Sequence, residues 1–181
     1  MPAARYRLLL IVLLAPLLIP GFVLLSSEIP AESAPTAGTG LYQETSPLVV
    51  FRGGPWKQAT SSADSGGAVS YATSAQSSAS LTFSGSSIQW LARKSPKSGT
   101  ATVHVDGKLL ATVDLYAAQT RFSQVVVATD KLSAGGHTIT VTRTGRANAR
   151  ASSTVMQFDA FNVPERVAPT APAIVKAEPH N

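Results

Sequence analysis

The 181-residue chain contains no cysteine, which excludes disulfide bonds, a thiolate metal site and a lipid-modified cysteine after a leader. Small secreted domains with weak cores often depend on disulfides for stability. A domain of this chain has to be held together by the burial of apolar side chains alone. The absence of cysteine therefore favours a full-sized β-sandwich.

The chain also lacks the common catalytic signatures. Its three histidines, His104, His137 and His180, show neither the His-x-His nor the His-x-x-x-His spacing of zinc sites. There is no Gly-x-Ser-x-Gly nucleophile elbow. A glycosidase needs two carboxylates across a cleft, and nothing in the sequence pairs Asp106 with Asp114. We therefore expect the protein not to be an enzyme.

Acidic residues are fewer than basic ones, and the net charge is +5. In residues 44–164 alone there are eleven Lys or Arg and six Asp or Glu, so the excess lies in the predicted domain. A basic module outside the cell meets anionic wall polymers, lipid headgroups or acidic sugars, or its charge simply keeps it soluble. No basic motif with stacking aromatics is present, so nucleic acid is not an expected partner.

The N-terminal part carries one long apolar run, from Leu8 to Leu25, which has no charged residue and follows Arg5 and Arg7. Positive charges before such a run tend to stay cytoplasmic, which predicts that the rest of the chain is extracytoplasmic. The run is longer than the ~7–15 residues of a signal-peptide core and close to the ~20 of a membrane span. A helical membrane anchor, a cleaved signal peptide and a buried helix of the domain remain open for residues 1–27.

The rest of the chain divides by composition. Residues 28–40 are small, polar and proline-containing, which predicts a flexible linker. Residues 165–181 are rich in Pro and Ala and predict a disordered tail. Residues 41–164 between them are enough for one domain. We expect a bacterial cell-envelope protein that is either anchored through its single N-terminal segment or secreted.

The predicted domain alternates apolar and polar residues with period two, as in Ala79, Leu81 and Phe83 or in Ile139 and Val141. This period is typical of strands with one buried face, and helix signals are almost absent. Closely spaced strands without helices predict an all-β fold, an antiparallel sandwich or jelly roll, after the N-terminal hydrophobic helix. The expected strands lie near residues 48–52, 67–74, 79–83, 87–93, 100–105, 109–115, 121–128, 137–144 and 154–163.

Two local irregularities are predicted as well. Asp106-Gly107 separates two alternating runs and predicts a tight hairpin, because Gly accepts the positive φ of such a turn. In the last strand, Met156 and Phe158 fall on the opposite face from Phe161 and Val163. A β-bulge near residues 159–160 would bring the two pairs into agreement.

Residues 42–163 resemble the galactose-binding-like jelly-roll modules of secreted bacterial proteins, relatives of the carbohydrate-binding modules attached to glycosidases. The resemblance covers nearly the whole predicted domain. It implies a β-sandwich that binds glycans or serves as a spacer. The segments that carry it are YQETSP (42–47), RGGPW (52–56), IQWLARK (88–94), HVDGKLLATVDLY (104–116), LSAGGHTITVTRTG (132–145) and QFDAFNV (157–163).

The resemblance also implies a metal question. In calcium-dependent members, an acidic residue near the first strand and an Asp in the last strand help to hold a structural ion, and Glu44 and Asp159 occupy the like positions. Ser46 stands where many members have a second acidic residue. Calcium prefers six to eight oxygen ligands. Both a calcium site and a purely structural hydrogen-bond role therefore remain open for Glu44 and Asp159, with no other cofactor expected.

Sugar binding usually needs an aromatic platform, because the C–H faces of pyranose rings are apolar. Trp90 lies at strand spacing from Ile88, so its ring faces either a ligand or the core. Trp56 follows a Gly-Gly-Pro turn and either plugs one end of the sandwich or lies on its surface. Tyr116 ends a strand and opens a loop, where its ring either meets a ligand or caps the core. The aromatic candidates are Trp56, Tyr71, Trp90, Tyr116 and Phe122.

Two predicted loops are basic, one around Arg93, Lys94 and Lys97 and the other around residues 143–150. Should they meet in space, they would form an anion site; otherwise they are solvated charge. The ligand-binding set predicted from the sequence is Trp56, Trp90, Arg93, Lys94, Tyr116 and Phe122.

The sequence thus predicts a non-catalytic extracytoplasmic module that binds polysaccharide at the cell envelope. The alternative is a structural or protein-interaction β-sandwich of the cell surface that has no sugar site. Exposed aromatic rings over a groove would favour the first, and fully packed rings the second.

Overall fold

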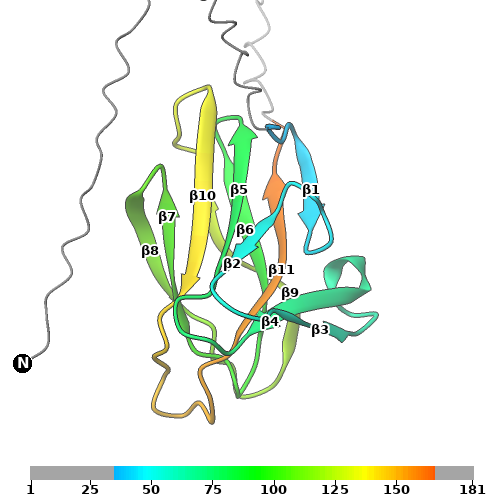
Figure 1. Cartoon of the computed structure of the whole chain (residues 1–181), viewed down its shortest axis with the longest axis vertical. Coiled ribbons are helices and arrows are strands. Elements are labelled where there is room, and N and C mark those ends of the chain that lie inside the picture. The colour runs from blue at the N-terminus through cyan, green and yellow to red at the C-terminus, as the bar shows by residue number, and fades with distance from the viewer. Residues whose placement is uncertain (1–34, 166–181) are drawn as a thin grey trace, which may run out of the picture. The chain divides into compact units, whose positions relative to one another are not determined.

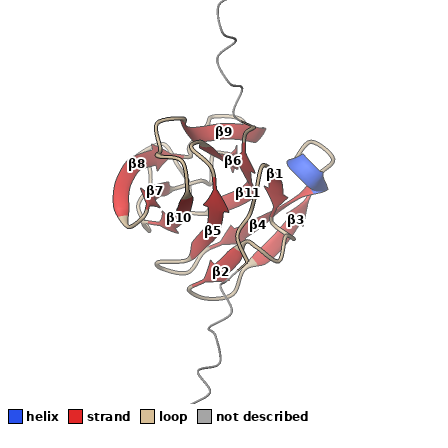
Figure 2. Cartoon of the chain, turned by 90° about the horizontal axis from the view of Figure 1, so that it is seen from above, coloured by secondary structure: helices blue, strands red, loops and turns tan. Residues whose placement is uncertain are grey.

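The period-two segments form eleven strands in two antiparallel sheets that pack face to face (Figures 1 and 2). The structure is a computed structural model that describes residues 35–165. The predicted all-β antiparallel sandwich is therefore confirmed. A single 3₁₀ turn, η1 (Ser65–Gly67), is the one helical element in the described range.

The larger sheet has six strands, with β1 (Gly40–Gln43) pairing with β11 beyond the main path. Figure 2 shows this layer facing the five-stranded one. The main path runs in the order β3 (Lys57–Thr60), β4 (Ala68–Ala72), β11 (Met156–Val163), β6 (Ile88–Lys94) and β9 (Arg121–Thr129).

The smaller sheet has five strands, and its outer face is covered with Ser and Thr. Its order is β2 (Val50–Arg52), β5 (Ser78–Ser84), β10 (Gly136–Arg143), β7 (Thr100–Val105) and β8 (Lys108–Asp114).

All nine strands predicted from the sequence are present, while β1 and β3 were missed. The β3 sequence, KQAT, is mostly exposed and has no apolar alternation, so it carries no strand signal. Chain pairing starts even before β1, because the Ala37 nitrogen donates to the Thr82 carbonyl at 2.9 Å and Ala37 is fully buried. Ala37 falls in the segment predicted as linker, so at least that part of it is ordered against the sandwich.

Both predicted irregularities are confirmed. Asp106 and Gly107 connect β7 to β8 with φ of 51° and 74°, the two positive values that a tight hairpin turn needs. The pairing of β11 with β6 shifts register between Phe158 and Ala160. Because of this bulge, Phe158 and Phe161 both face the core, with their ring centroids 4.8 Å apart.

The core lies between the sheets and is apolar throughout. Trp90 at its centre is 0% exposed, and Phe83, Phe158 and Phe161 are equally buried. Strand β6 shows how the sequence builds this layer: alternate residues Ile88, Trp90 and Ala92 are buried, and those between them are not.

The predicted N-terminal helix and C-terminal tail lie outside the described residues. Within residues 35–165, no helix is long and apolar enough to cross a membrane.

Candidate functional site

Three loops gather at one end of the sandwich, the lower end in Figure 1, which we call the loop end. Each of them connects two strands that follow one another in the chain between β6 and β11. They are the β6–β7 loop (residues 95–99), the β8–β9 loop (115–120) and the β10–β11 loop (144–155).

Backbone hydrogen bonds join these loops, with the β6–β7 loop in the middle. On one side, the Ser95 nitrogen donates to the Leu115 carbonyl at 3.2 Å and the Ala117 nitrogen donates to the Ser95 carbonyl at 3.3 Å. On the other side, the Ser152 nitrogen donates to the Pro96 carbonyl at 2.8 Å. The two basic loops predicted from the sequence therefore do lie side by side.

Arg143, the last residue of β10, fixes the far end of the β10–β11 loop. It is only 8% exposed; its Nε donates to the Thr154 carbonyl at 2.7 Å and its Nη1 to the Ser74 carbonyl at 3.0 Å. Because its guanidinium donates to backbone carbonyls, Arg143 positions the loop and does not face a ligand.

Two pockets open at the loop end, one on each side of the end of β6. The first, of about 460 Å³, is bordered by Lys94, Tyr116, Gln119, Arg121 and Gln124; we call it the Tyr116 pocket. The second, of about 580 Å³, is bordered among others by Tyr71, Arg93, Lys97, Thr120 and Gln157; we call it the Arg93 pocket. Arg93 and Lys94 reach different pockets because successive strand side chains point in opposite directions.

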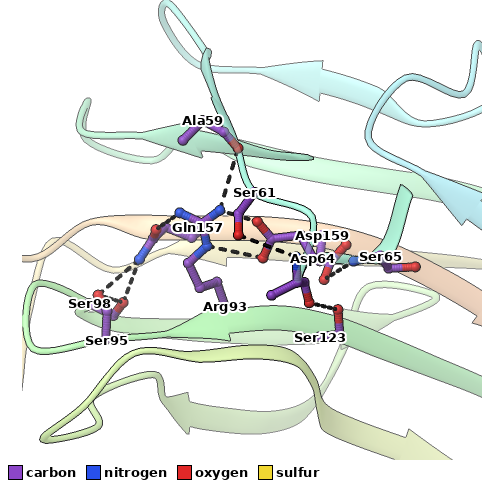
Figure 3. A network of polar contacts seen from close by, with 11 residues as sticks. Ala59, Ser61, Asp64, Ser65, Arg93, Ser95, Ser98, Ser123, Gln157 and Asp159 are labelled. Atoms are coloured by element: carbon purple, nitrogen blue, oxygen red, sulfur yellow. Dashed lines mark hydrogen bonds and ion pairs between the residues drawn. The ribbon is translucent and has the colours of Figure 1, made fainter. Parts of the chain in front are cut away.

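A buried polar network forms the wall of the Arg93 pocket (Figure 3). The Arg93 guanidinium binds both carboxylate oxygens of Asp64, with its Nε 3.1 Å from Oδ1. It also donates to the Gln157 side-chain oxygen at 3.4 Å, and its Cζ lies 5.2 Å from the centre of the Phe122 ring. Arg93 thus links β6, β11, β9 and the β3–β4 loop at one point.

Gln157 carries this network into the loops. Its Nε2 donates to the hydroxyls of Ser95 and Ser98, each at 3.0 Å, and those two hydroxyls lie 2.8 Å apart. All three side chains are buried. Because buried polar groups need partners, this arrangement fixes the conformation of the β6–β7 loop.

A second buried cluster holds the two residues predicted as metal ligands. Asp159, fully buried, accepts a hydrogen bond from the Ser65 nitrogen at 3.3 Å, and burial raises its pKa to about 6. Burial is also the main cause that raises the pKa of Glu44, with Asp64 adding repulsion. Three buried oxygens have no partner in the described chain: Gln43 Oε1, Glu44 Oε2 and Asp159 Oδ1.

These oxygens suit calcium in kind but not in number. In residues 35–165, no three acidic or histidine side chains lie close enough together to hold a metal ion. Asp64, the nearest further carboxylate, is engaged by Arg93. Calcium asks for six to eight oxygens, and the three unpartnered side-chain oxygens would supply part of that set.

Four of the six predicted ligand-binding residues come together at the loop end. Lys94 and Tyr116 border one pocket, Arg93 borders the other, and Phe122 supports the Arg93 guanidinium from the side. Tyr116 is half-buried, as expected for a ring at the rim of a pocket.

The other two residues lie elsewhere. Trp90 is fully buried in the core and has no surface to offer a ligand. The prediction that Trp90 belongs to the binding set is therefore wrong, because its side chain lies on the core face of β6. Trp56 packs on Phe51 with ring centroids 4.6 Å apart and donates from Nε1 to the Arg52 carbonyl at 3.1 Å. It closes the β2–β3 edge of the core and borders neither pocket.

Several pocket residues were not in the predicted binding set. Gln119, Arg121, Gln124 and Gln157 border the pockets, but a polar residue on a predicted strand or loop has no local signal for this role. Tyr71, one of the aromatic candidates in the sequence, borders the Arg93 pocket. Its neighbours in that pocket come from other strands, which no local pattern reveals.

Comparison with known proteins finds similarity in structure only. No protein-family model matches the sequence, and no curated protein sequence matches it. A Paenibacillus xanthan lyase aligns over 74% of this chain and 14% of its own, with 13% identity and a TM-score of 0.56. A two-domain esterase active on acetylated mannans aligns over 69% and 36%, with 16% identity and a TM-score of 0.52.

A family 35 carbohydrate-binding module is similar over 93% of its own length, with 17% identity and a TM-score of 0.49. The chain spans well under half of the lyase and of the esterase. The alignments with the lyase and the esterase, at 13% and 16% identity, establish the fold alone. The fold that the sequence predicted, a β-sandwich like the modules of carbohydrate-active proteins, is confirmed.

Proposed function

We propose that this protein is a non-catalytic module that binds glycan chains at its loop end, in the extracytoplasmic space of the cell envelope. The observation that carries the proposal is the pair of pockets beside the end of β6, each bordered by a tyrosine, glutamine amides or hydroxyls, and a cation. An apolar ring face together with hydrogen-bonding groups is the chemistry that a sugar requires. The extracytoplasmic location rests on the apolar N-terminal run.

The absence of catalysis is part of the proposal. None of the residues that border either pocket is acidic. Hydrolysis of a glycosidic bond generally uses two carboxylates that flank the bond. The buried acids Glu44, Asp64 and Asp159 belong to the structural clusters beside and beneath the site.

The test is a calorimetric titration of the protein with a panel of neutral and acidic polysaccharides. We expect saturable binding that Tyr116→Ala weakens roughly three- to tenfold, the range for loss of one aromatic contact. Tyr116→Phe retains the ring and is expected to retain most of the affinity. Trp56→Phe, at a site away from both pockets, is the control and is expected to leave the affinity for glycan unchanged.

A protein-interaction role is the second candidate, because β8 is an edge strand of the five-stranded sheet in the described residues. Leu109 and Leu110 on this strand are 61% and 41% exposed. An exposed apolar edge is a recognised site for pairing with another chain. Absence of glycan binding across the panel, in a well-folded protein, would favour this role.

A further inference from the structure

We propose that the glycan chain bound at the loop end is anionic and carries carboxylate groups. This inference rests on the proposed glycan binding. It starts from five basic side chains, contributed by four separate segments, that make no ion pair and no side-chain hydrogen bond within residues 35–165. They are Lys94, Lys97, Arg121, Arg146 and Arg150.

The most informative pair is Lys94 and Arg121. They are direct cross-strand partners at the ends of β6 and β9, and both border the Tyr116 pocket. Like charges directly opposite each other across two strands are destabilising. No acidic side chain of residues 35–165 borders this pocket, so the described part of the chain does not relieve the repulsion. A bound anion between the two would relieve it.

The remaining cations extend the positive surface past the second pocket. Lys97 borders the Arg93 pocket. The carbonyl of Arg146 accepts from the Thr100 nitrogen at 2.8 Å, which places this residue against the start of β7. Arg150 lies two residues before Ser152, whose backbone nitrogen donates a hydrogen bond to the Pro96 carbonyl. Both pockets are thus flanked by positive charge.

The positive charge at the loop end is not neutralised by neighbouring acids. Of the six acidic residues in 44–164, Asp64 is taken up by Arg93 in the wall of the Arg93 pocket, and Asp114 lies at the loop end. Its two oxygens already accept hydrogen bonds from the Tyr116 nitrogen and the Asn148 side chain, each at 2.9 Å. The cations that are paired internally, Arg93 with Asp64 and Arg143 with carbonyls, are different ones.

Carboxylate is the anion that this set of groups fits. Ammonium and guanidinium groups form charge-assisted hydrogen bonds with carboxylates, and Arg matches their planar geometry. In the same pocket, Tyr116 supplies an aromatic ring for the sugar, and Gln119 and Gln124 supply amides for its hydroxyls. A polymer of sugars that bear carboxylates presents all three groups together.

The experiment compares polygalacturonate with its fully methyl-esterified form, which has the same backbone without the charge. We expect the protein to bind the free acid at least tenfold more tightly than the ester. We also expect this affinity to fall as NaCl is raised from 20 to 300 mM, because salt shortens the range of exposed charges to about 10 Å at 0.1 M. Alginate, a neutral galactomannan and a phosphate-bearing teichoic acid complete the panel.

Two double variants locate the charge effect. Lys94→Gln with Arg121→Gln removes the cross-strand pair, and we expect it to weaken acid binding about three- to tenfold, from up to about 1 kcal/mol for each exposed charge. Lys108→Gln with Lys131→Gln removes the same charge at the opposite end, beside the β7–β8 turn and in the β9–β10 loop. For this matched control we expect less than a twofold change.

The outcomes separate the two proposals. If the ester or the galactomannan binds as tightly as the acids, glycan binding stands and the inference of an anionic ligand is wrong. If teichoic acid alone binds, the ligand is anionic but the carboxylate assignment is wrong. If both double variants weaken binding equally, the loop end is not the site. If no polysaccharide binds to the folded protein, both proposals are wrong.

Discussion

The guanidinium of Arg93 holds both carboxylate oxygens of Asp64, across 29 positions of sequence. Asp64 is fully buried in its side chain and that of Arg93 is 12% exposed. The pair fastens the β3–β4 loop onto the outer face of the six-stranded sheet, next to a candidate ligand pocket (Figure 3). Its position makes it both a fold determinant and a wall of the site.

Removal of Arg93 is expected to be costly. Arg93→Met leaves Asp64 as a buried charge without its partner, which typically costs about 3–5 kcal/mol. Unfolding in urea measures this loss, and Lys97→Gln, at an exposed cation nearby, should change the free energy of unfolding by less than about 0.5 kcal/mol. A loss below about 1 kcal/mol for Arg93→Met would show that the pair does not hold the loop.

Asp159 is expected to destabilise the protein above pH 6. Its folded-state pKa of about 6 exceeds the ordinary 3.8, so the native state binds the proton more tightly than the unfolded state does. The free energy of unfolding therefore falls as pH rises from 3.8 to about 6. Asp159→Asn should therefore stabilise the protein at pH 7.5 by about 3 kcal/mol and change its stability little at pH 4. Thermal unfolding in EDTA measures both, and a destabilised variant at pH 7.5 would contradict the prediction.

His137 is expected to make the stability of the protein depend on pH above 6.5, a higher region than the one in which Asp159 titrates. Its Nδ1 lies 2.6 Å from Asp106 Oδ2 and its Nε2 lies 2.9 Å from the Ser133 carbonyl. Both partners are acceptors, so the doubly protonated ring satisfies both. The hydrogen bond with Asp106, first, and that with Ser133 raise the pKa of His137 above its usual 6.5.

The stabilisation from a raised histidine pKa is complete below pH 6.5 and is lost as pH rises through the folded-state value. The melting temperature of the protein should therefore fall as pH rises above 6.5, and His137→Gln should remove this part of the fall. His104→Gln, which alters a histidine without an ion pair in the described chain, should retain it. An unchanged profile in His137→Gln would refute the assignment.

Gly99 is expected to admit no side chain. A Cβ at this position would lie 2.5 Å from the Arg146 carbonyl oxygen and 2.8 Å from the Thr154 Cα, where the loops of the site meet. Gly99→Ala should cost about 1–3 kcal/mol, as overpacking does, and should weaken glycan binding. Gly136→Ala is the matched control, because nothing lies within 4 Å of its Cβ. Equal stability of the two variants would show that the junction yields freely.

Much of the fold was predictable because its signals are local. A strand with one buried face alternates its side chains whatever its partner is, so β5 and β10 were visible in the sequence. The turn at Asp106-Gly107 needs only a backbone that accepts positive φ, and the bulge in β11 follows from its two conflicting apolar pairs. Strand β3 was missed because its exposed residues carry no such pattern.

The site was predictable only in part. Arg93, Lys94 and Tyr116 stood out as cations and an aromatic ring at strand ends, and these positions do border the pockets. Trp56 and Trp90 stood out equally, because the local sequence around an aromatic residue is the same whether its ring is buried or exposed. Their burial depends on the opposing sheet, which the alternation of one strand does not specify.

The sequence by itself determined the all-β class, most of the strands, the hairpin, the bulge and the basic charge. The tertiary structure alone decided which charges meet. It joined Arg93 to Asp64, set Lys94 opposite Arg121 and brought the basic loops together around two pockets. The physical reason is that local backbone preference and side-chain alternation act between neighbours, whereas these contacts follow from the pairing register of strands far apart in the chain.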